Sequence, residues 1–226
     1  MLKTRVSGGH SQSRLFGWAL IAAGVLAVVF MLHHPVAEGG NLAERLASME
    51  RMRGVASWVH GLLCAVLVVI WAGLMGLSQN LGWHRFAPVC GFVCISAGSL
   101  LYIGAAMISG FVVPELAADG SAGAAKSTHQ ILALLWHGNQ ALANAGAVAT
   151  AAAIGFLSCS MLSRSGLLQW TGGVGVVIAG ATLLGLVLGW IALDVRGMTL
   201  VTIAHSGWYV LAGLCLLGPM RAQNQQ

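Results

Sequence analysis

Charged side chains are scarce in this sequence. Only 8% of its 226 residues are Asp, Glu, Lys or Arg, and 58% are hydrophobic. Soluble domains carry about 25% charged residues, so a mean hydropathy of +0.83 excludes a soluble fold for most of the chain. The formal net charge is +5, but the basic residues stand singly between apolar segments. Because nucleic-acid binding uses a clustered basic patch, we expect no nucleic-acid partner.

Several signatures of common enzymes are also missing. The sequence contains no phosphate-binding G-x-x-x-x-G-K-[ST] loop, no G-x-S-x-G elbow, no H-E-x-x-H zinc motif and no C-x-x-C-H haem-attachment motif. These absences argue against the commonest enzyme classes. The five cysteines all fall within apolar segments, so structural disulfides are not expected.

Six long apolar segments fill most of the chain. A helix needs roughly 20 apolar residues to cross a bilayer core about 30 Å thick. The segments are Leu15–Leu32, Val55–Leu77, Phe86–Val113, Ile131–Leu162, Leu167–Val195 and Thr199–Pro219. They predict an all-α bundle of six transmembrane helices, with residues 1–226 forming a single integral membrane domain. The first apolar run is longer than a signal-peptide core, so we interpret it as an uncleaved helix.

Charge at the ends of these segments predicts their orientation. Lys and Arg concentrate on the cytoplasmic side of a membrane. The side of the N-terminus has basic residues and no acidic ones, namely Lys3, Arg5, Arg14, Arg85, Arg164 and Arg221. The other side has the remaining basic residues and all the acidic ones. We therefore predict three hairpins in a bacterial inner membrane, N-in and C-in, with outer loops near residues 35–54 and 114–130.

The first outer loop has a helical pattern. Leu42, Leu46 and Met49 recur at helical spacing, with Glu and Arg between them. This pattern predicts a short amphipathic helix on the outer membrane surface.

Polar residues gather at the outer ends of the even-numbered segments. They recur three or four residues apart, so each set forms one stripe on its helix. The stripes are Ser57, His60 and Cys64; His137, Gln140 and Asn144; and Thr202, His205 and Tyr209. Polar side chains in a membrane face the bundle interior or a water-filled cavity. The three stripes therefore predict one histidine-lined pocket that opens toward the periplasm.

Histidines from several helices suit a transition metal. Neutral imidazole is a common ligand for zinc and copper. The candidate metal ligands are His60, His137, His205, His33 and His34. Thioethers favour Cu(I), and the candidate thioethers are Met31, Met49, Met52 and Met198. Such a pocket would serve metal handling, electron transfer or metal-assisted chemistry.

Two further cofactor hypotheses use fewer of these residues. Haem of the b type needs only two axial ligands, for which His60 and His205 are the candidates. Hydrolysis at an open zinc position needs a nearby acid or base. Asp194 and Glu115, at the outer ends of their segments, are the candidate catalytic groups.

A non-enzymatic interpretation explains the same residues without a cofactor. Trp58, Trp136 and Trp208 stand beside the three histidines, and aromatic rings gather at membrane interfaces. Asn and Gln also join helices by hydrogen bonds. The chain would then be an accessory subunit in the lipid bilayer, with a membrane partner or a second copy of itself. A small-molecule carrier is a second alternative, although no acidic residue lies at mid-span.

Overall fold

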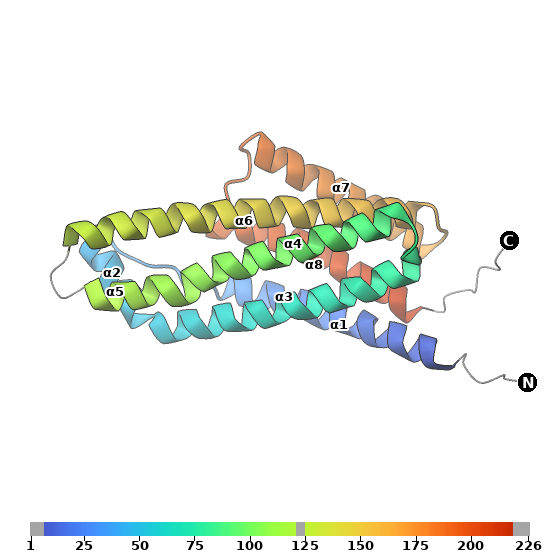
Figure 1. Ribbon diagram of the computed structural model, residues 1–226, viewed down its shortest axis with the longest axis horizontal. Helices are drawn as coiled ribbons and strands as arrows, with labels where there is room; N and C mark the ends of the chain where they lie inside the picture. Colours follow the sequence, from blue (N-terminus) through green and yellow to red (C-terminus); the bar gives the residue numbers. More distant parts are fainter. Residues whose placement is uncertain (1–6, 121–124, 219–226) are drawn as a thin grey trace, which may run out of the picture.

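The computed structural model describes residues 7–120 and 125–218, and the elements in these ranges are all helical. Six of the helices are long and apolar enough to cross a membrane, which is consistent with a multi-pass membrane protein (Figure 1). The elements are α1 (Ser7–Leu32), α2 (Leu42–Arg51), α3 (Arg53–Gly82), α4 (Phe86–Met107), η1 (Ile108–Val112), α5 (Val113–Gly120), α6 (Ala125–Leu162), α7 (Leu167–Val187) and α8 (Val195–Leu217).

The long helices run side by side, with two short ones at one end (Figure 1). α1 packs against α3 and α8, and α4 packs against α6. α7 packs mainly against α6 and less against its neighbour in sequence, α8. The start of α1 and the end of α8 lie at the same end of the bundle, opposite α2 and α5. We call the latter end the α2–α5 end.

Small residues let the helices approach closely. In membranes, helix association depends on backbone packing because lipid is as apolar as the side chains. A β-carbon on Gly17 of α1 would lie 2.8 Å from the carbonyl oxygen of Gly213 on α8. The reverse contact, from Gly213 to the carbonyl oxygen of Gly17, would be 2.6 Å. The two glycines are therefore required for the observed α1–α8 contact.

The first predicted outer loop contains the expected amphipathic helix. α2 begins after Asn41, whose side-chain oxygen accepts the backbone N–H of Glu44 at 3.0 Å. The Glu44 carboxylate in turn accepts from Asn41 Nδ2 at 2.7 Å. This exchange is an N-terminal capping arrangement, and it explains why the helix starts there.

Three sequence-based boundaries are corrected by the structure. The predicted outer loop at 114–130 is largely helical, because η1 and α5 continue the line of α4 as far as Gly120 and α6 begins at Ala125. The fifth span ends at Val187, shortly before Gly189 with φ +70°, a conformation that favours glycine and stops a helix. The sixth span begins at Val195, where the Asp194 side chain caps the backbone N–H of Gly197 at 2.8 Å.

Candidate functional site

A cavity of about 220 Å³ lies inside the bundle toward the α2–α5 end. It is bordered by α1, α3, α4, α6 and α8, and most of its lining residues are apolar. Imidazole, hydroxyl and amide groups reach it from several of these helices. An apolar pocket with a few convergent polar groups is the usual form of a binding site.

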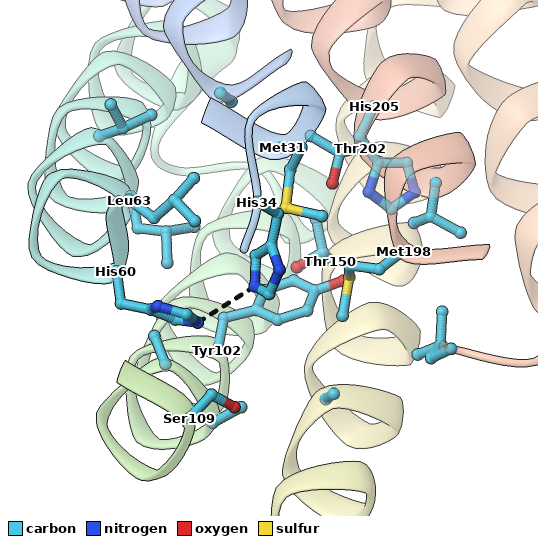
Figure 2. A pocket seen from close by; sticks show the side chains of 18 of the residues that line it. Met31, His34, His60, Leu63, Tyr102, Ser109, Thr150, Met198, Thr202 and His205 are labelled. Atoms are coloured by element: carbon cyan, nitrogen blue, oxygen red, sulfur yellow. Dashed lines mark hydrogen bonds between the residues drawn. The ribbon is translucent and has the colours of Figure 1, made fainter. Parts of the chain in front are cut away.

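Two histidines distant in sequence meet at this cavity. Nε2 of His34 lies 3.1 Å from Nε2 of His60, and the ring centroids are 4.8 Å apart with a 74° angle between the planes (Figure 2). His60 lies on α3 and is only 4% exposed. His34 follows the end of α1 and precedes Pro35. Because a residue before proline avoids the helical conformation, the chain leaves the helix here and His34 can turn back into the bundle.

Hydrogen bonding fixes the proton positions in this pair. Nδ1 of His60 lies 2.8 Å from the carbonyl oxygen of Ala56. A carbonyl only accepts, so Nδ1 of the neutral ring carries the hydrogen and donates it. Nε2 of His60 then has a lone pair, which accepts the N–H of His34. Metal-binding histidines are held in this way, with the second ring nitrogen donating to a backbone carbonyl or carboxylate.

His34 is uncharged at neutral pH. Burial and the charge of His60 lower the pKa of His34 from 6.5 to about 4, and the Pro35 backbone opposes this lowering only in part. Proline has no amide hydrogen, so the backbone group that it offers to His34 is its carbonyl. The His34 side chain therefore keeps one lone pair available across the physiological range.

Two thioethers face the same space. Met31 and Met198 both line the cavity, and Figure 2 shows their side chains reaching it from α1 and α8. Met31 lies in the last turn of α1 and is 7% exposed, and Met198 lies in the first turn of α8. The lining of the cavity thus contains the imidazoles of His34, His60 and His205 and the two uncharged sulfur atoms of Met31 and Met198.

His205 lines the same cavity but lies apart from the His34–His60 pair (Figure 2). Its Nε2 lies 3.4 Å from the hydroxyl oxygen of Thr182 on α7, and the lone pair of His60 faces His34. The structure therefore does not present His60 and His205 as two axial ligands facing each other.

The predicted stripes reach the cavity only in part. Gln140, Thr202 and Tyr209 line it, whereas Ser57, Cys64, Asn144, His33 and His137 do not. This corrects the pocket predicted from the sequence.

The direction in which each side chain leaves α6 explains why His137 and Asn144 do not reach the cavity. The buried face of α6 is centred on Ala143, and at 100° per residue His137 and Asn144 point about 100–120° away from it. Both are exposed. Asn139 instead lies about 40° from the centre, lines the cavity and accepts the hydroxyl hydrogen of Ser109 at 3.0 Å.

Three other predicted side chains lie outside the cavity. Ser57 donates to the carbonyl oxygen of Gly110 at 2.9 Å. Exposed His33 places its Nδ1 2.8 Å from the carbonyl oxygen of Val29. Cys64 is partly buried on α3 outside the cavity.

The two candidate acids have structural roles. Glu115 forms an ion pair with Arg53 at 3.1 Å, and both side chains are at least half exposed. Asp194 lines the cavity, but it is an exposed residue whose carboxylate caps α8. Neither arrangement resembles a general base held beside an open metal position.

A π-helical turn positions His60. In η1 the backbone N–H of Val113 bonds the carbonyl of Ile108, five residues back, and such turns are frequent at functional sites. A β-carbon on Gly110, within this turn, would overlap Cβ of His60. Glycine is therefore required where the π turn crosses the histidine.

Replacing Gly110 with alanine should shift His60 or unwind the π turn. We expect the free energy of unfolding to fall by about 1–3 kcal/mol, as for other overpacked sites. Thermal unfolding of the protein in detergent measures the change. Gly138→Ala is the control, because a β-carbon there meets nothing within 4 Å. Equal stability of the two variants would contradict the close contact between Gly110 and the His60 side chain.

No three His, Cys, Asp or Glu side chains gather as a metal cluster within residues 7–120 and 125–218. The donors that do meet are His34 and His60, and Met31 and Met198 line the same cavity. No protein-family model, curated protein or solved structure matches the chain, so any function must be argued from this geometry.

Proposed function

We propose that this membrane protein binds a transition-metal ion between His34 and His60. The observation that carries the proposal is the 3.1 Å separation of their Nε2 atoms. Two nitrogens bound at about 2.0–2.1 Å to one tetrahedral ion lie about 3.3 Å apart. The two nitrogens must therefore move apart by about 0.2 Å, and both rings must turn so that their lone pairs converge on the ion.

Binding needs one proton to change place. His60 already offers a lone pair, because its hydrogen is engaged by the carbonyl of Ala56. His34 must move its hydrogen from Nε2 to Nδ1, a buried atom that has no hydrogen-bond partner among the described residues. Both rings then direct lone pairs toward the ion, and Nδ1 of His60 keeps its bond to the Ala56 carbonyl.

This geometry favours a bare ion over haem b. The two axial imidazoles of a haem stand on opposite faces of its plane. Here the His60 lone pair is directed at His34, while His205 contacts Thr182. A haem ligated by His60 and His205 would have to displace His34.

The proposed role is metal handling at the outer side of a bacterial inner membrane. It takes the predicted N-in, C-in orientation, in which the α2–α5 end faces the periplasm. Labelling of a Gly40→Cys variant from outside intact cells, with no labelling of Ser165→Cys, tests this orientation. Both positions are exposed at opposite ends of the bundle.

Removal of both histidines tests the binding site. Purified protein in detergent is titrated with Zn²⁺, Co²⁺ and Cu(I), and the bound metal is counted by elemental analysis. We expect one ion per chain in the wild type and none in the His34→Gln/His60→Gln variant. The His33→Gln/His137→Gln variant also lacks two histidines, both exposed and outside the cavity, and it should bind like the wild type. A wild type that binds none of the three ions contradicts the proposal, and the polar cavity is then interhelical packing.

A further inference from the structure

We infer that the ion bound at the His34–His60 pair is Cu(I), with the thioethers of Met31 and Met198 as its additional ligands. The inference rests on the proposed function and adds the identity of the ion. It is drawn from two properties of the cavity, namely the softness of its donors and the single carboxylate, Asp194, in its lining.

The donor atoms match a soft ion. Met31 and Met198 line the same cavity as His34 and His60. Thioether sulfur binds Cu(I) and is a poor ligand for Zn²⁺, which prefers thiolate, imidazole and carboxylate. Met31 is buried in the last turn of α1, three residues before His34. The end of α1 therefore contributes both the Met31 sulfur and the His34 imidazole to the cavity.

The charge of the site favours a monovalent ion. Two neutral imidazoles and two thioethers leave the full charge of the ion uncompensated. The electrostatic cost of burying an ion scales with the square of its charge, so a divalent ion costs about four times as much as a monovalent one. Asp194 is the only carboxylate lining the cavity within the described part of the chain, and it caps the start of α8.

The flexible side chains of Met31 and Met198 can move their sulfur atoms toward the ion. Met31 and Met198 lie on different helices, α1 and α8, which pack against each other. Methionine has three rotatable side-chain bonds and adapts its sulfur position without backbone movement. His34, by contrast, lies between α1 and Pro35 and is fixed by its bond to His60.

Replacement of the two methionines separates this inference from the proposed function. Wild-type protein and the Met31→Leu/Met198→Leu variant are titrated anaerobically with Cu(I) against a chromophoric chelator, and separately with Zn²⁺. We expect the variant to bind Cu(I) at least 10-fold more weakly, with its Zn²⁺ affinity unchanged. Met49→Leu/Met52→Leu is the control, because these methionines lie outside the cavity and their loss should change neither affinity.

The outcomes are distinct. Unchanged Cu(I) affinity in Met31→Leu/Met198→Leu overturns the inference, as does a parallel loss of Cu(I) and Zn²⁺. In both cases the proposed function stands if His34→Gln/His60→Gln still abolishes binding. If the wild type binds neither ion, the proposed function fails and the inference fails with it. Leucine preserves the apolar volume of methionine, and thermal unfolding of the variant shows whether the fold is kept.

Discussion

Replacing His60 with glutamine should lower the affinity for the bound metal ion about 100-fold or more. Loss of a group that merely orients a ligand costs 10–100-fold in metal affinity, and His60 is proposed as a ligand itself. Its Nδ1 donates to the Ala56 carbonyl at 2.8 Å, so its lone pair is held in place before the ion arrives. Competition with a chromophoric chelator measures the affinity.

His205→Gln is the matched control for this variant. His60 and His205 are both 4% exposed and both line the cavity, so each replacement removes a buried imidazole. Only His60 lies within hydrogen-bonding distance of His34. We expect His205→Gln to bind the ion as the wild type does. Equal losses in the two variants would place the ion between His60 and His205 and would favour the haem-like arrangement instead.

Replacing Gly175 with valine should destabilise the bundle by about 3 kcal/mol, the upper range for overpacked sites. A β-carbon at this position of α7 would overlap the Ser158 hydroxyl of α6 and the indole nitrogen of Trp208 on α8. Trp208 is fully buried and donates its indole hydrogen to the carbonyl of Thr171 at 3.2 Å. Because α6, α7 and α8 are in contact at this point, no single helix can move away to make room for the valine side chain. Thermal unfolding in detergent measures the loss.

Gly180→Val provides the comparison on the same helix. A β-carbon on Gly180 meets nothing within 4 Å, so this valine should face lipid and change stability little. If both variants unfold together, helix propensity rather than packing controls stability, and the contact of α6, α7 and α8 is wrong.

The transmembrane helices could be predicted because hydrophobic length alone defines them. Six segments were expected and six helices of suitable length and composition are present. The ends of the helices depend on capping side chains and on glycine conformation, which a hydropathy profile does not show. Gly189 and the capping side chain of Asp194 divide the fifth span from the sixth, and only capping rules applied to residues 188–195 could have placed that boundary.

The candidate site was predicted less completely. His60 follows from its position in an otherwise apolar span, and His205 lies in the same cavity. The partner of His60, however, lies in the connection after α1, and spacing along one chain says nothing about which loop residue meets which helix. His34 was one of several candidates until the 3.1 Å contact selected it.

Two other misjudgements have simple causes. On α6 the sequence analysis selects His137, but the buried alanines Ala143 and Ala147 mark the face that turns inward. Asn139 lies near that face and lines the cavity, so the alanines are the better guide to the polar residue. The non-enzymatic interpretation places Trp208 at the membrane interface, whereas it is fully buried and donates to the Thr171 carbonyl of α7.

The central claim is that one ion is held by His34 and His60 together. X-ray absorption spectroscopy of the Cu(I)-loaded protein counts the imidazole ligands directly through scattering from the outer ring atoms. We expect two imidazoles per copper in the wild type and in the His205→Gln variant, and no more than one in His34→Gln. A spectrum without imidazole scattering, or one that keeps two imidazoles in His34→Gln, would contradict it.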